Sequence, residues 1–387
     1  MKRILLLILV IVLGIGMVIM GCGGAPPAEE EEEEEERTVI ELDFGTFWPA
    51  VDFQVTMGHK EWAKAISDLV QQRTKKYSVK WYWYYSISPG ALRTGAQNGT
   101  YDVITSGPGY YAGVYPLWEG PEFPASTTVV PRKNAYTMSM ALQKLWDEST
   151  ALQQEFAAKE PSLKVMHYWS TGPGYFLMVA GKNVTVLEDF AGKKIRAANP
   201  ASVKCIEALG GTPQYMPMSA ALLAFQAGTI DGILCPTDTP KGFGLSAYVR
   251  SCTYAPFSYQ FVFYKLMNKA TYDGLPAEVR AIVDEVNAKY ADYYGKLRTW
   301  GEHDGLVFCR SSLGAAFSEY NLPVANPTEY QRWLDAVYPS LINAWIAGDA
   351  AKQELWNKFT TIAQWADATY GGWTHSYPTP PPPPTFP

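Results

Sequence analysis

The stretch from Lys193 to Gly232 constrains the fold of this 387-residue chain more than any other part. Short apolar runs, which are typical of strands, alternate there with segments at helical spacing. Asn199 before Pro200 is a favoured helix start, and Ser219 stands at a second one. Alternation of this kind predicts an α/β body with a largely parallel sheet.

A single arginine, Arg196, stands at the end of the first strand predicted in this stretch. Its guanidinium is a planar, two-pronged donor that matches the geometry of a carboxylate. We interpret Arg196 as the anchor for a carboxylate ligand. The alternative is an ordinary ion pair with an Asp or Glu of the chain itself.

The same alternation extends along the body. Apolar and aromatic runs predict strands over residues 38–46, 79–85, 101–105, 163–168, 175–180, 229–234 and 260–268. Helical spacing predicts helices over residues 57–76, 91–98, 134–159, 276–300, 327–347 (kinked at Pro339) and 349–370. The Gly172-Pro173-Gly174 break predicts a hinge near residues 170–175.

Residues 1–22 have the layout of a secretory signal, with a basic pair before an apolar run over residues 4–20. Ile19-Met20-Gly21-Cys22 resembles a bacterial lipobox, in which Cys22 is lipidated. A permanent transmembrane anchor is the alternative, since about 17 apolar residues are near the lower limit for spanning. We expect an exported, lipid-anchored protein that faces the periplasm or the cell exterior.

Both ends of the chain are compositionally biased. Residues 23–37 carry the run Glu29–Glu36, a self-repelling block that predicts an extended tether. Without these eight glutamates and the two basic residues of the signal, 32 basic and 38 acidic side chains become 30 of each. This neutral body does not favour nucleic acid as a partner. Residues 377–387 form a proline-rich tail outside the core.

Cysteine and histidine patterns predict neither a metal site nor a cofactor. Four cysteines besides Cys22 allow two disulfides or free buried thiols, namely Cys205, Cys235, Cys252 and Cys309. The four histidines are not spaced as metal ligands. The sequence has no nucleophile elbow, metalloprotease motif or phosphate-binding glycine loop, so we do not expect an enzyme.

Over roughly residues 40–300, an ordered set of motifs resembles the solute receptors of tripartite ATP-independent periplasmic (TRAP) transporters, the DctP type. The landmarks are Leu42-Asp43-Phe44-Gly45, Trp48-Pro49, Gly90-Ala91-Leu92, Asn98-Gly99-Thr100-Tyr101-Asp102-Val103, Tyr115-Pro116-Leu117, Leu187-Glu188-Asp189, Gly192-Lys193-Lys194-Ile195-Arg196, Ala208-Leu209-Gly210 and Ile230-Asp231-Gly232. Any one of them is a weak signal, whereas the ordered set is specific.

The resemblance implies a two-lobed periplasmic-binding-protein-like α/β fold with a hinge and a long bracing helix. Residues 38–172 plus about 260–300 are expected to form lobe I, and 173–259 plus about 301–376 lobe II. Such a receptor closes on a small organic acid and delivers it to a membrane permease, and the arginine at the Arg196 position pairs with the carboxylate. A receptor for a sensor kinase or an ABC importer is the alternative.

Several residues depart from the family pattern in a direction that makes the pocket less polar. The chain lacks the second arginine that some members carry near Tyr175, and Ile233-Leu234-Cys235 replaces a polar run. We therefore expect an apolar or aromatic monocarboxylate, with Trp48 and Tyr175 as stacking candidates. The other expected ligand contacts are Asn199, Cys235 and Gly107, the last in a turn just after a strand.

Overall fold

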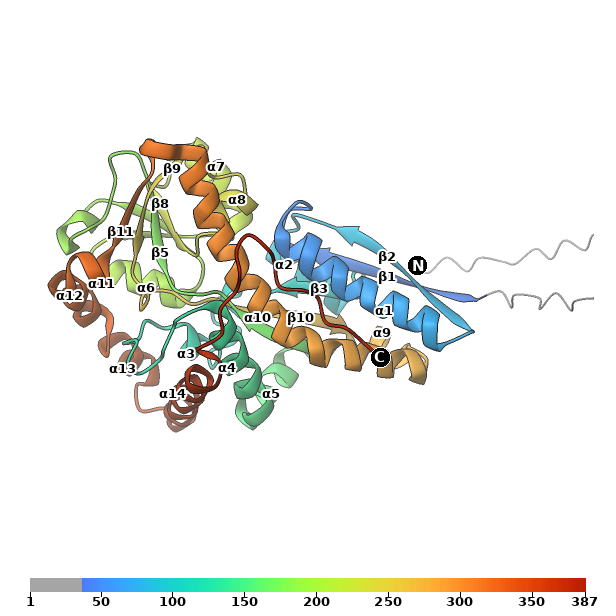
Figure 1. Cartoon of the computed structure of the whole chain (residues 1–387). Helices are drawn as coiled ribbons and strands as arrows, with labels where there is room; N and C mark the ends of the chain where they lie inside the picture. The colour runs from blue at the N-terminus through green and yellow to red at the C-terminus, as the bar shows by residue number, and fades with distance from the viewer. Residues whose placement is uncertain (1–36) are drawn as a thin grey trace, which may run out of the picture. The chain divides into compact units, whose positions relative to one another are not determined.

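A computed structural model describes residues 37–387 and contains two β-sheets covered by helices (Figure 1). The predicted signal peptide, Cys22 and all but the last residue of the predicted tether lie outside the described residues. Within residues 37–387, every helix is too short or too polar to span a lipid bilayer.

The first sheet has the strand order β2-β1-β3-β10-β4. Its strands are β1 (Thr38–Thr46), β2 (Tyr77–Tyr84), β3 (Val103–Ser106), β4 (Leu163–Ser170) and β10 (Val262–Asn268). The first three are mutually parallel, whereas β10 is antiparallel to both β3 and β4.

The second sheet has the order β11-β9-β5-β8-β6-β7. Its strands are β5 (Tyr175–Val179), β6 (Lys194–Ala197), β7 (Thr212–Tyr215), β8 (Gly232–Cys235), β9 (Val249–Tyr254) and β11 (Ser318–Asn321). Here β6, β7 and β8 are parallel, and β5 is antiparallel to β8 and β9.

The antiparallel strands follow the points where the chain passes between the sheets. From β4 the chain leaves the first sheet and enters the second through β5, and from β9 it returns to the first through β10. The two strands that enter directly from the other sheet, β5 and β10, run against their neighbours, whereas β11, which follows α10, is parallel to β9. The parallel sheet that we expected is therefore interrupted once in each sheet.

The helices, in chain order, are α1 (Lys60–Arg73), α2 (Pro89–Gln97), α3 (Glu119–Glu122), α4 (Ala135–Glu148), α5 (Thr150–Lys159), α6 (Pro200–Ala208), α7 (Ala221–Gln226), α8 (Thr239–Gly242), α9 (Lys269–Gly274), α10 (Ala277–Leu313), α11 (Leu322–Ala325), α12 (Pro327–Val337), α13 (Ser340–Ile346) and α14 (Ala350–Tyr370).

Three predicted helices differ in their details. The single helix expected over 134–159 is split at Ser149, whose side chain caps α5 by accepting from the Leu152 N–H at 3.4 Å. The helix expected over 327–347 is interrupted at Pro339, between α12 and α13. Ser219 makes no cap hydrogen bond, because it lies inside a 3₁₀ turn that precedes α7.

The 37-residue helix α10 connects the two sheets (Figure 1). It packs against α1, α4 and β4 of the first sheet's layer and against α8 beyond the second sheet. It continues to Leu313, well past the end that we expected near Trp300. The lobe boundaries stay a proposal. The last helix, α14, packs against α4 and α3, although we assigned α4 to lobe I and residues 301–376 to lobe II.

The proline-rich segment after α14 runs back along α10, coloured red in Figure 1. Trp300 Nε1 donates to the Pro378 carbonyl at 3.1 Å, and Lys289 Nζ donates to the Thr385 carbonyl at 2.8 Å. Lys289 also lies over the ring of Phe386, 4.5 Å from its centroid. These contacts hold the segment at the surface of α10 without placing it in a core.

Candidate functional site

A small buried cavity lies where loops of both sheets meet α10. Its volume is about 20 Å³, enough for one water molecule. The lining residues come from both sheets' layers and from α10, and they are Phe47, Trp48, Tyr110, Thr171, Arg196, Met218, Cys235, Pro236, Asp238, Thr239, Phe243, Tyr259, Phe263 and Arg298. Two arginines thus share a cavity in which half of the other lining residues are aromatic.

A larger groove of about 800 Å³ lies between α10 and the proline-rich segment, but its cations are already engaged. Lys296 pairs with Asp292 at 2.7 Å, and Lys289 holds the Thr385 carbonyl. The small cavity differs in containing buried cationic nitrogens with no partner. We therefore regard the small cavity as the candidate site.

Arg196 lies in β6, between β7 and β8, where it pairs in register with Gln214 and Ile233. Its side chain is fully buried. Nε donates to the Met216 carbonyl at 2.9 Å, whereas Nη1 and Nη2 have no hydrogen-bond partner in the part of the chain that the structure describes. No carboxylate within residues 37–387 forms an ion pair with it. The guanidinium is therefore held in place through Nε, and Nη1 and Nη2 remain available for a bidentate contact with an anion.

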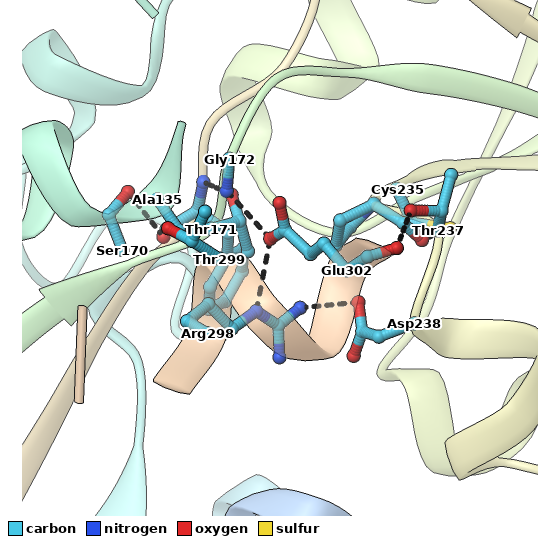
Figure 2. Close-up of polar contacts among 12 residues, drawn as sticks. Ala135, Ser170, Thr171, Gly172, Cys235, Thr237, Asp238, Arg298, Thr299 and Glu302 are labelled. Carbon is cyan, nitrogen blue, oxygen red and sulfur yellow. Dashed lines mark hydrogen bonds and ion pairs between the residues drawn. The ribbon is translucent and has the colours of Figure 1, made fainter. Parts of the chain in front are cut away.

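Arg298, on α10, is the second arginine of the cavity and is also buried (Figure 2). Its Nη2 pairs with Asp238 Oδ1 at 2.8 Å, and its Nε pairs with Glu302 Oε1 at 3.1 Å. Asp238 belongs to the loop after β8, so this pair connects α10 to the second sheet. The remaining nitrogen, Nη1, is buried without a partner.

Glu302 extends the same network to the segment that we expected to be the hinge (Figure 2). Its Oε1 accepts the Gly172 backbone N–H at 2.7 Å, and its carbonyl accepts the Thr237 hydroxyl at 2.5 Å. A β-carbon at Gly172 would collide with Glu302 Oε2, so this approach requires glycine. Arg298 and Glu302, one turn apart on α10, thus contact both the connection between β4 and β5 and the loop after β8.

Three buried carboxyl groups surround Arg298. Burial raises the pKa of Asp52 to about 7, and the charge of Asp238 adds to this shift. Burial likewise raises the pKa of Glu302 to about 7, against the opposing effect of Arg298. The pKa of Asp238 is also raised by burial, and Arg298 opposes the shift. One arginine does not offset the cost of ionising all three groups together.

Aromatic side chains form the rest of the wall. Phe47 and Phe243, from the two sheets' layers, have ring planes 14° apart and centroids 6.5 Å apart. Trp48 packs on Phe263, with centroids 5.0 Å apart. Burial raises the pKa of Tyr110 to about 12, although the nearby Arg196 opposes the shift. The cavity therefore combines aromatic side chains with two arginines, Asp238 and the hydroxyl groups of threonine and tyrosine residues.

Of the residues that the sequence singled out, Arg196, Trp48 and Cys235 all line the cavity. The Cys235 thiol is buried, as are the free thiols of Cys205, Cys252 and Cys309, so among residues 37–387 the described cysteines form no disulfide. No cluster of metal-ligating side chains occurs in the described part of the chain.

Gly107, Tyr175 and Asn199 do not line the cavity. Gly107 packs against Phe261 and the Val262 carbonyl, and its turn contributes Tyr110 to the wall instead. The Tyr175 ring lies on Tyr254 with centroids 5.0 Å apart.

Asn199 has a structural explanation. It caps α6 by accepting the Ser202 N–H at 2.7 Å, and its Nδ2 donates to the Gln260 carbonyl at 3.1 Å. Both ends of its amide are thus used by the chain itself.

Sequence reasoning missed Arg298 and Asp238. The available signal was the Arg298–Glu302 pair, which continues the buried face of the helix that carries Val286, Tyr290 and Tyr294. Charged residues on a buried face need partners, and such a face is where a polar site is expected.

The chain was compared with known families and structures. The model of the family described as "Bacterial extracellular solute-binding protein, family 7" matches residues 59–339. The C4-dicarboxylate-binding periplasmic protein DctP of Rhodobacter capsulatus is 29% identical over 127 residues, which cover 33% of this chain and 37% of DctP. The match thus spans only about a third of that relative's length.

Two solved structures share the fold. A TRAP solute binding protein of Rhodoferax ferrireducens, in complex with copurified benzoate, has a TM-score of 0.74 and 23% identity over 85% of this chain and 99% of its own. A TRAP solute binding protein of an unidentified marine microbe, in complex with 3-hydroxybenzoate, has a TM-score of 0.73, 23% identity and the same coverage. Both similarities concern the fold.

Proposed function

We propose, since this chain belongs to family 7 of the bacterial extracellular solute-binding proteins, that it captures a small aromatic monocarboxylate for a TRAP permease. The observation that carries the proposal is Arg196, a fully buried guanidinium with both terminal nitrogens unpartnered. Leaving a buried charge without a partner is costly, and a carboxylate ligand would supply that partner. As the family binds solutes, its members are not enzymes.

The charges around the cavity favour a ligand with one negative charge. Asp238 already balances Arg298 through an ion pair of 2.8 Å. The carboxyl groups of Asp52 and Glu302 have pKa values raised to about 7 by burial, which leaves them partly protonated near neutral pH. Arg196 is therefore the one cavity cation that lacks a counter-charge. A second ligand carboxylate would have to displace Asp238 from Arg298.

The wall favours a ligand with a planar body. A ring stacked between Phe47 and Phe243 would need centroids about 7–8 Å apart, given carbon contacts of about 3.5–4 Å. The present separation is 6.5 Å and the cavity has room for one water molecule, so a ring enters only after the two sheets' layers move apart. Two of the structures that resemble this chain were solved with benzoate and 3-hydroxybenzoate, whereas others were solved with orotic acid or pyroglutamic acid. Benzoate and 3-hydroxybenzoate combine one carboxylate with one aromatic ring.

We propose that the signal directs export and that Cys22 carries the lipid, so that residues 23–37 tether the receptor beside its permease. The two sheets are proposed to form the two lobes, which close on the ligand about the segment near Gly172.

A thermal-shift screen of residues 38–377 tests this function. The panel contains benzoates, aliphatic monocarboxylates, 2-oxo acids, dicarboxylates and sugar acids. A ligand at about 100 times its Kd adds about 2.7 kcal/mol of stability, which is readily visible. We expect stabilisation by aromatic monocarboxylates and none by dicarboxylates. A well-folded protein that none of these acids stabilises would contradict the proposal.

A further inference from the structure

Arg298 presents one unused hydrogen-bond donor inside the same cavity. Two of its three nitrogens are bound, Nη2 by Asp238 and Nε by Glu302. Figure 2 shows these contacts on one side of the guanidinium and the third nitrogen on the other. That third nitrogen, Nη1, is buried and has no partner within hydrogen-bond distance.

The surroundings of Arg298 leave one direction open. The ring centroids of Phe263 and Phe53 lie 5.6 Å and 5.8 Å from its guanidinium carbon, which is within the range of cation–π interactions. Its ion pairs occupy one edge. Asp52 forms no ion pair with Arg298 within residues 37–387, and Arg298 is one of the residues that line the cavity, so we infer that its Nη1 edge faces this space.

The chemistry of the missing acceptor follows from the charge of the network. A buried donor without an acceptor is costly, so ligand binding gains if the ligand supplies an oxygen at this point. The positive charge of Arg298 is already offset by Asp238, with Glu302 alongside. A neutral oxygen, such as a hydroxyl or a ketone, therefore fits better than a second carboxylate.

We propose that Arg298 is a specificity-determining residue that donates from Nη1 to a neutral oxygen on the body of the ligand. The ligand class narrows accordingly from an aromatic monocarboxylate to one that carries a hydroxyl or oxo group. This inference rests on the proposed function, in which Arg196 holds the carboxylate. Arg298 sets the preference among acids and Arg196 decides whether an acid binds.

The test compares ligands that differ by one oxygen. Calorimetry gives the Kd of 2-, 3- and 4-hydroxybenzoate and of the toluates, which carry a ring methyl group in place of the hydroxyl and keep the carboxylate. It also gives the Kd of mandelate and of 2-phenylpropanoate. Each pair has a similar shape, so the ratio of the two Kd values reports the oxygen alone. For at least one pair we expect the oxygenated acid to bind about 10- to 100-fold more tightly to the unmodified protein, the usual range for a bond to a charged donor. Ratios below about threefold for every pair would overturn the proposal.

The same ratio is then measured in a variant. Arg298→Met combined with Asp238→Asn removes the donor without leaving Asp238 as an unpaired buried charge. We expect the ratio to fall to near one. A ratio that persists in the folded variant would overturn the assignment of the donor to Arg298. Arg310→Met removes a more exposed arginine of α10 that pairs with Glu319, and the ratio should not change there.

If the double variant does not fold, Arg298→Lys serves instead. Its single ammonium cannot hold Asp238 and reach the ligand with the same fork, so the ratio is again expected to fall. An unchanged ratio in this variant would count against the proposal. Failure of the proposed function is a different result, because then no carboxylic acid binds at all.

Discussion

The backbone N–H of Gly172 donates to Glu302 Oε1 at 2.7 Å, which ties the connection between β4 and β5 directly to α10. Glu302 also pairs with Arg298, and Arg298 with Asp238, so one helical turn contacts the chain on both sides of the cavity. A ligand that contacts Arg298 is therefore connected, through Glu302, to the segment near Gly172. We propose that the lobes close about this segment.

Gly172→Ala is expected to destabilise the protein. The added methyl group would collide with the Glu302 carboxylate, and overpacking of a buried site typically costs about 1–3 kcal/mol. Urea denaturation measures the change in the free energy of unfolding. Gly90→Ala is the matched control, since nothing lies near its β-carbon position and alanine favours its helix. Equal effects of the two substitutions would show that Gly172 is not confined by Glu302.

Asp52 gives the stability a defined pH dependence. Its folded-state pKa is raised to about 7 by burial, so it favours the folded state most below its unfolded pKa of about 4. That contribution is lost as pH rises from about 4 through 7, a total of about 2–4 kcal/mol. Asp52→Asn should therefore gain stability relative to the unmodified protein over this interval.

Urea denaturation from pH 4 to 8 measures this difference, with Asp68→Asn as the control at an exposed carboxylate. His59 and His167 contribute a pH dependence of the opposite sign. This contribution cancels when the curve of the unmodified protein is subtracted from that of Asp52→Asn. Burial lowers the pKa of both histidines, which costs stability as pH falls below about 6.5. A difference between Asp52→Asn and the unmodified protein that does not vary with pH would contradict the raised pKa.

Lys265 is a fully buried lysine that forms no ion pair with a carboxylate among the described residues 37–387. Its Nζ lies 3.7 Å from the Trp62 ring centroid and 3.0 Å from the Tyr294 hydroxyl. Burial lowers its pKa well below the usual value, so the folded state loses stability as pH falls below about 10.4. Lys265→Met removes this penalty.

We expect the gain in unfolding free energy from Lys265→Met to be larger at pH 6 than at pH 9, by about 1–4 kcal/mol. Chemical denaturation at the two pH values is the measurement. Lys269→Met, at an exposed lysine nearby in sequence, should show no such trend. An equal gain at pH 6 and pH 9 would contradict the lowered pKa, because it would mean that Lys265 stays charged in the fold at little cost.

Local sequence patterns predicted what depends on neighbours in the chain. The alternation around Arg196 and the cap at Asn199 are local, and the structure has β6 and α6 there. The predicted end of α10 near Trp300 was wrong, and Gly301 and Gly305 lie just beyond it, inside the helix. In the structure Phe53 packs against Gly301, and the Asp238 backbone against Gly305. Glycine is used there for close approach, which only the tertiary fold reveals.

The site residues that belong to local motifs were likewise predictable, and those that depend on distant partners were not. Arg196 and Trp48 belong to short motifs, so their place at the cavity followed from the chain. The Arg298 role depends on Asp238, which is 60 residues away in sequence. Tyr175 fits the aromatic pattern of a strand, but the strand's own neighbour, Tyr254, takes up its ring.

The most direct test of the account is the Kd of benzoate for Arg196→Ala, measured by calorimetry. The two unpartnered nitrogens of Arg196 are proposed to hold the carboxylate, so the loss should be about 2–5 kcal/mol of binding free energy. Lys194→Ala, at an exposed basic residue of the same strand, is the control and should bind as the unmodified protein does. Methyl benzoate, which has no charge, should bind neither protein. An Arg196→Ala protein that is folded and binds benzoate with unchanged affinity would contradict the account.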